Sequence, residues 1–99
     1  MQITIRSIHF NANQKLLNFI KKKINKLTRF NDELISIDIF LRLENASDKN
    51  NKLVEVKINT GFNELFVSKK RESFEESIDL VQDILIRLVK KNKQKKRLI

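Results

Sequence analysis

The sequence contains no cysteine, proline, tryptophan or tyrosine, and it has one glycine, Gly61, and one histidine, His9. Without cysteine the chain can form no disulfide framework, no thiolate metal site and no cysteine nucleophile. His9 lies between a predicted strand and a predicted helix, which is typical of a loop histidine. The sequence also lacks a glycine-rich phosphate loop, a metal-ligand cluster and a nucleophile motif. We therefore expect a protein that is not an enzyme and that needs no cofactor or metal.

Long hydrophobic runs are missing as well. No eighteen consecutive apolar residues occur, and the first residues lack the basic and apolar regions of a secretory signal. These absences predict a cytoplasmic protein that does not contact a membrane. Of the 99 residues, 40% are hydrophobic and 33% are charged, which is a foldable composition. We expect one small domain over residues 1–99, without a second, dimerising domain.

Positive charge is in excess, with 21 lysines and arginines against 12 acids and a net charge of +9. Six cations and no acid lie between Lys15 and Arg29, and seven cations and no acid lie between Arg87 and Arg97, whereas residues 31–59 hold six acids against four bases. Cations suit a helix C-terminus, but the second run extends beyond the single turn over which the helix dipole acts. The surplus therefore implies an anionic partner.

Periodic apolar residues define the secondary structure. Alternation predicts strands, and spacings of three and four predict helices. The predicted strands cover residues 1–8, 35–44, 52–59 and 64–69, and the predicted helices cover residues 14–29 and 73–99. Asn13 and Ser73 are suited to cap the helices, and Glu76 completes a capping box with Ser73. A turn at residues 60–63 contains Gly61, where a positive φ is easiest. The second helix is expected to bury the stripe Phe74, Ile78, Val81, Leu85 and Leu88.

This order of elements predicts an α+β fold. Three sequential strands form an antiparallel meander, and the first strand joins them through a helix crossover. The fold is then β-α-β-β-β-α, a four-stranded mixed sheet with two helices packed on one face. If the helices lie side by side, their cations line one basic groove that would bind phosphates. Phe40 is expected to be a packing residue at a sheet edge rather than a platform on which bases stack.

Several segments resemble one known family along nearly the whole chain. They are the opening strand, Phe19 to Leu27 with Phe30, Lys52 to Val56, Phe74 to Asp79, and the series Asp83, Leu85, Arg87, Val89 and Lys91-Asn92-Lys93. Together and in this order they resemble the ribosome hibernation promoting factors, which include the ribosome-associated inhibitor and were once called sigma-54 modulation proteins. Ile84 departs from the lysine that the family often has, and Glu75 and Glu76 replace aromatic and small residues.

The resemblance implies a protein that occupies the channel for mRNA and tRNA on the small ribosomal subunit. It would block translation and favour inactive ribosomes or ribosome dimers, with no small-molecule substrate, and it would be monomeric off the ribosome. The length resembles the short form of the family. Matching positions imply rRNA contacts by Lys23, Lys26, Arg87, Lys91 and Lys93, and charge alone adds Lys22, Lys90 and Lys95.

Two other interpretations stay open from the residues themselves. One is a regulator whose basic helices dock an acidic protein, and the other is a general RNA-binding protein. A helix that docks a protein should expose apolar anchors between its charges. The runs Lys21-Lys22-Lys23 and Lys90-Lys91-Asn92-Lys93 contain none.

Overall fold

The structure is a computed structural model that describes residues 1–44 and 49–98, with side chains up to residue 93. Its elements are β1 (Gln2–Ile8), α1 (Gln14–Asn25), the 3-10 helix η1 (Lys26–Arg29), β2 (Ser36–Leu43), β3 (Lys52–Asn59), β4 (Glu64–Arg71) and α2 (Phe74–Leu98). The predicted order of strands and helices is confirmed.

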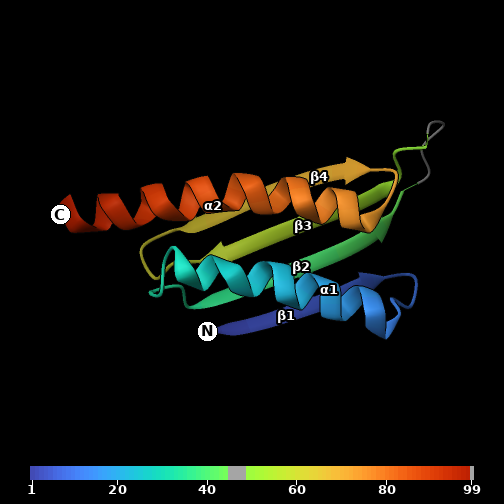
Figure 1. Ribbon diagram of the computed structural model, residues 1–99, viewed down its shortest axis with the longest axis horizontal. Helices are drawn as coiled ribbons and strands as arrows, with labels where there is room; N and C mark the ends of the chain where they lie inside the picture. Colours follow the sequence, from blue (N-terminus) through green and yellow to red (C-terminus); the bar gives the residue numbers. More distant parts are fainter. Residues whose placement is uncertain (45–48, 99) are drawn as a thin grey trace.

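The four strands form one mixed sheet in the order β1-β2-β3-β4. β1 is parallel to β2, while β2, β3 and β4 pair in antiparallel fashion. Both helices cover the same face of this sheet, and the other face is uncovered (Figure 1). The fold class predicted from the sequence is therefore confirmed. Phe40, however, was wrongly expected at a sheet edge, because β2 lies in the middle of the sheet.

Alternating residues of the central strands supply the sheet side of the core. Side chains of successive residues in a strand point to opposite faces, so one face of β2 and β3 is apolar. The residues that are fully buried there are Ile37, Ile39, Leu41, Val54, Val56 and Ile58. The helices add Ile20, Ile24, Leu27, Ile78, Val81, Leu85 and Val89, all at 0% exposure. This core places the polar faces of both helices outward.

The apolar stripe of α2 differs from the prediction at its end. Leu88 was expected to continue the stripe, but Leu88 is only partly buried and Val89 is fully buried. A step of four from Leu85 keeps the stripe over the sheet, and the next buried residue on the same row is Asn92. The buried stripe therefore ends with Val89 and the polar residue Asn92, and not with Leu88.

Both predicted N-caps are present. The Asn13 side chain accepts a hydrogen bond from the Leu16 N–H at 2.8 Å, and the Ser73 hydroxyl accepts one from the Glu76 N–H at 3.1 Å. The first helix was expected to continue as α-helix to Arg29, but its last turn tightens into η1. Tightening of this kind is common at helix ends, where i to i+3 bonds satisfy carbonyls that lack a partner.

The turn between β3 and β4 has the conformation that its glycine predicts. Gly61 has a φ of 80°, in the region where only glycine is unstrained. The Thr60 hydroxyl accepts a hydrogen bond from the Asn63 N–H at 2.8 Å, and the Asn63 side-chain oxygen accepts one from the Asn92 amide at 2.7 Å. The turn is thereby attached to α2.

His9, also at positive φ, is exposed in the connection from β1 to α1.

Candidate nucleic-acid interface

The two helices run in the same direction and lie side by side (Figure 1). β1 and β4 are both parallel to β2, since β4 is antiparallel to β3 and β3 to β2. α1 follows β1 and α2 follows β4. Both helices therefore begin at one end of the molecule and finish at the other. Because most lysines lie near the helix C-termini, both basic segments come to the same end of the molecule.

Polar contacts hold the helices together at this end. The Gln82 side-chain amide donates to the Lys23 carbonyl at 2.7 Å, and the buried Asn31 amide donates to the Val89 carbonyl at 3.2 Å. Both bonds join segments that are distant in the sequence. The relative position of α1, η1 and α2 is therefore determined by specific bonds as well as by the core.

Three of the predicted rRNA-binding cations have partners within the protein. The Lys23 amine lies 2.9 Å from an Asp79 carboxylate oxygen, and the Lys93 amine lies 3.6 Å from one of Asp32. The Lys90 amine lies 4.6 Å from the centre of the Phe30 ring, a cation–π geometry. These contacts join α2 to α1 and to the connection that follows η1, and they reduce the charge available to an external anion.

Four other predicted cations are exposed and make no ion pair with any residue whose side chain is described: Lys22, Lys26, Arg87 and Lys91. With 100° per residue in an α-helix, Arg87 is turned about 140° and Lys91 about 180° from Gln82, which faces α1. The unpaired cations of α2 thus point away from α1. The last predicted residue, Lys95, lies in the part of α2 whose side chains fall outside the described residues.

The expectation that the cations of both helices line one groove between them is therefore wrong. The groove is occupied by paired side chains, while the unpaired cations lie outside it. On the α1 side, Lys22, Lys26 and Arg29 line a hollow of about 220 Å³ together with Asn25 and Thr28. A second hollow, beside β1, is lined by Met1, Ile3, Lys21, Lys22 and Asn25. Arg29 and Lys21 were not among the predicted site residues, although both belong to the cationic face of the first helix.

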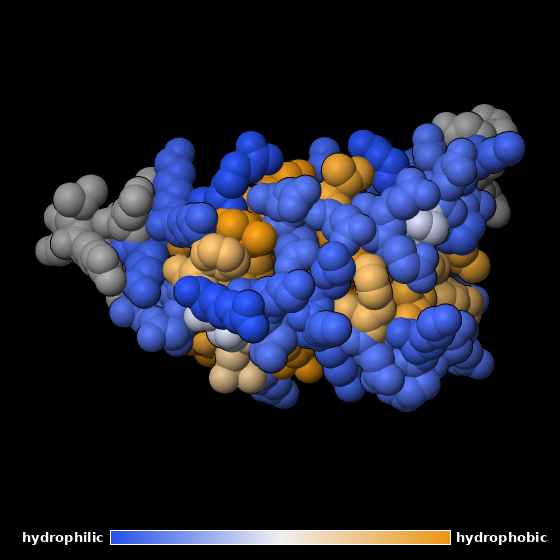
Figure 2. All heavy atoms as spheres, viewed as in Figure 1, coloured by the Kyte–Doolittle hydropathy of each residue, from blue (hydrophilic) through white to orange (hydrophobic). Residues whose placement is uncertain are grey.

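None of the three cations of the first hollow forms an ion pair with an acid in the described part of the chain, so the hollow is suited to an anion. A phosphate there would be bound by two flexible ammonium groups and one planar guanidinium, which can bind phosphate oxygens in a bidentate manner. Hydrophilic side chains cover most of the helix side of the molecule (Figure 2).

Among the described residues, no three His, Asp or Glu side chains form a group able to hold a metal ion, and no described helix has the length and hydropathy of a membrane span.

Comparisons with known proteins agree on one family. The family described as Sigma 54 modulation protein / S30EA ribosomal protein matches residues 3–97. A ribosome hibernation promoting factor of Azotobacter vinelandii is 25% identical over 95 residues, which cover 96% of this chain and 85% of the relative. One of Pseudomonas putida is 24% identical over 97 residues, covering 98% and 91%.

Two solved structures share the fold. A ribosomal subunit interface protein from Coxiella burnetii superposes with a TM-score of 0.83 at 18% identity, covering 95% of this chain and 99% of that one. The N-terminal domain of Protein Y from Thermus thermophilus superposes with a TM-score of 0.73, also at 18% identity, covering 91% and 93%.

Proposed function

Because this chain belongs to the Sigma 54 modulation protein / S30EA ribosomal protein family, we propose that it is a ribosome hibernation factor. It binds the small ribosomal subunit in the channel for mRNA and tRNA, blocks translation there and favours inactive ribosomes or ribosome dimers. The names of the two curated relatives support this role. In this proposal the protein acts in the cytoplasm and without catalysis.

The observation that carries the proposal is the acid-free hollow at the end of the first helix. Lys22, Lys26 and Arg29 converge there, and Arg87 and Lys91 are exposed in the C-terminal half of α2. Both helices end at the same end of the molecule (Figure 1). We call these five residues the basic surface. An rRNA backbone presents phosphates at regular intervals, so a surface that offers several unpaired cations binds it with a strong dependence on salt.

The shape of the protein is consistent with action by occupancy. The molecule is flat and elongated, with extents of 46 × 25 × 18 Å. One continuous core joins its two layers, and hydrogen bonds attach α2 to α1 and to Asn31 within the helix layer. A rigid body of this kind excludes other ligands from the space it fills, and it needs no chemical step to do so.

Docking of the helices to an acidic protein is less well supported. The exposed large hydrophobic residues in the described part of the chain are Met1, Ile35, Leu43, Phe62 and Phe66. None of them lies in α1, η1 or α2. The helices, as far as their side chains are described, therefore lack the apolar anchors that a helix in a protein groove normally uses, and an RNA partner fits them better.

Co-sedimentation with purified small subunits and whole ribosomes tests this function. We expect saturable, nearly one-to-one binding at about 50 mM salt that weakens at about 200 mM salt. The double variant Lys22→Glu/Lys26→Glu should lower the slope of log affinity against log salt by about 0.7 to 0.9 for each phosphate that is no longer neutralised. The matched control Lys15→Glu/Lys49→Glu makes the same charge change at exposed sites outside the basic surface and should bind like the unchanged protein.

Two results would contradict the proposal. One is the absence of ribosome binding at low salt. The other is binding that never saturates and that equals binding to any duplex RNA, which would leave a general RNA-binding protein.

A further inference from the structure

The uncovered face of the sheet carries an aromatic residue at its centre, which the basic surface does not use. Phe40 lies on β2, paired with Arg6 of β1 on one side and with Glu55 of β3 on the other. Its neighbours Ile39 and Leu41 point into the core, so Phe40 points to the opposite, uncovered face. A half-buried phenylalanine in this position leaves part of its ring exposed to a ligand.

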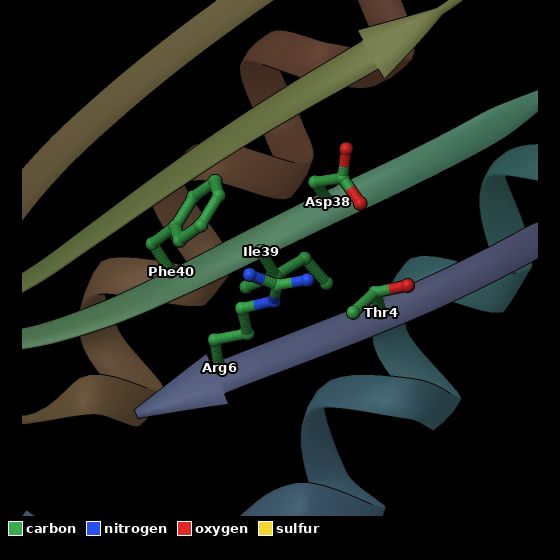
Figure 3. A pocket seen from close by; sticks show the side chains of 5 residues that line it. All are labelled: Thr4, Arg6, Asp38, Ile39 and Phe40. Atoms are coloured by element: carbon green, nitrogen blue, oxygen red, sulfur yellow. The ribbon is translucent and has the colours of Figure 1, made fainter. Parts of the chain in front are cut away.

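A small hollow opens beside this ring. Figure 3 shows it from the uncovered face, with Thr4 and Arg6 from β1 and with Asp38 and Phe40 from β2 around it; Ile39 also lines it. The Arg6 side chain reaches from β1 toward β2, between Phe40 and Thr4. The volume is about 150 Å³, equal to about five waters at ~30 Å³ each, and below the range of about 300 to 1,000 Å³ for drug-sized ligands.

Two charged groups in this hollow have no partner among the described residues. Asp38 is half-buried, yet it makes no hydrogen bond and no ion pair there, and Arg6 makes none either. Lys57 stands opposite Asp38 in the sheet, but its amine pairs with Glu64 at 3.4 Å. The hollow therefore offers a free acceptor and a free donor next to an aromatic ring.

We propose that this hollow binds a guanine base of single-stranded RNA. The base stacks on Phe40, its N1–H and N2–H groups donate to the Asp38 carboxylate, and its O6 and N7 atoms accept from the Arg6 guanidinium. The inference rests on the proposed function in one respect, namely that the partner contains RNA. It adds a second contact, on the opposite side of the sheet from the basic surface.

The pair of charges selects the class of ligand. Asp38 repels a bare phosphate, and Arg6 repels an arginine or lysine from a protein partner. A neutral group with donors and acceptors on one flat edge is attracted by both. Among the four bases only guanine places two adjacent donors beside two acceptors, whereas adenine, cytosine and uracil leave Asp38 or Arg6 partly unpaired. A buried polar group left without its partner lowers affinity.

The test is a titration of the ¹⁵N-labelled protein with U-rich hexaribonucleotides, followed by amide chemical shifts at about 0.3 M salt. One oligonucleotide has a single central guanosine, and the others have adenosine, cytidine or only uridine there. The guanosine should shift the amides of Thr4, Arg6, Asp38 and Phe40 and bind roughly 5- to 150-fold more tightly than the all-uridine chain, the discrimination expected for one bidentate contact to a base.

Three variants define the contact. Phe40→Leu should abolish the guanosine preference, whereas Phe66→Leu, the same change on the same face of β4, should preserve it. Asp38→Asn should remove the preference for guanosine over adenosine while stacking remains. Dispersed amide spectra of each variant show that it is folded, so that a weaker response reports weaker binding.

The outcomes separate this inference from the proposed function. Equal shifts with all four oligonucleotides, shifts confined to residues 21–29, or a stronger response to an arginine-containing peptide would overturn the guanine site while leaving ribosome binding intact. If the guanosine shifts appear but the protein does not sediment with ribosomes, the guanine site holds and the proposed function fails. The Lys22→Glu/Lys26→Glu variant should bind ribosomes more weakly, with the lower salt slope given above, and should still show the guanosine shifts at Thr4 and Phe40.

Discussion

Under the proposed function, Asp79 should compete with the RNA backbone for Lys23, and its removal should strengthen binding. The two side chains form an ion pair of 2.9 Å between α1 and α2, with exposed fractions of 30% for Lys23 and 52% for Asp79. In the variant Asp79→Asn, Lys23 is released from its internal partner and an exposed negative charge disappears. Lys23 becomes available to a phosphate, which adds one cation to those of the basic surface.

The size of the effect follows from counterion release. One additional neutralised phosphate makes the slope of log affinity against log salt steeper by about 0.7 to 0.9. Extrapolated over the tenfold range from 1 M to 0.1 M salt, this amounts to about 5- to 8-fold tighter binding at 0.1 M. The ion pair that the variant removes is partly exposed and contributes at most about 1 kcal/mol to the free energy of unfolding, so the variant should remain folded.

The assay is equilibrium binding of a fluorescently labelled protein to small ribosomal subunits at several salt concentrations. The matched control is Asp83→Asn, which removes the same charge one turn further along α2 at an exposed residue without an ion pair to any described side chain. Asp83 lies one turn before Arg87 on α2, so this control removes an acid close to the basic surface without releasing a paired lysine, and it should leave the salt slope unchanged. Equal affinities and slopes for the two variants would refute the idea that Asp79 restrains Lys23.

Two further predictions concern stability. Asn31, with 2% exposure, donates to the Val89 carbonyl and accepts from the Glu33 N–H, so Asn31→Ala should lower the free energy of unfolding in urea by about 1 to 3 kcal/mol. The exposed control Asn11→Ala should change it by less than about 0.5 kcal/mol; equal decreases would mean that the bond does not hold η1 to α2. Gly61→Ala should cost about 1 to 3 kcal/mol in thermal unfolding, because its φ of 80° strains any L-residue and its Cβ would lie 2.8 Å from the Ile35 side chain. Full stability of this variant would show that the turn can take another conformation.

Much of the fold was predictable because its signals are local. The bounds of β3 agree with the alternation from Lys52 to Asn59, and both helices begin at the predicted caps, Asn13 and Ser73. The errors arose where distant packing decided the outcome. Val89 replaced Leu88 in the core because the sheet determines which side of α2 is buried, and Phe40 proved central because the order of the strands is a property of the whole sheet.

The sequence by itself determined the elements, their order and the segments in which positive charge accumulates, since these follow from the periodicity and composition of adjacent residues. Only the tertiary structure decided which charges are free. Lys23 and Lys93 are paired with Asp79 and Asp32, residues far away in the chain, whereas Lys26 has no such partner in the described structure. The physical reason is that an ion pair depends on a few ångströms of separation between elements, and that distance is determined by how the helices pack on the sheet and on each other.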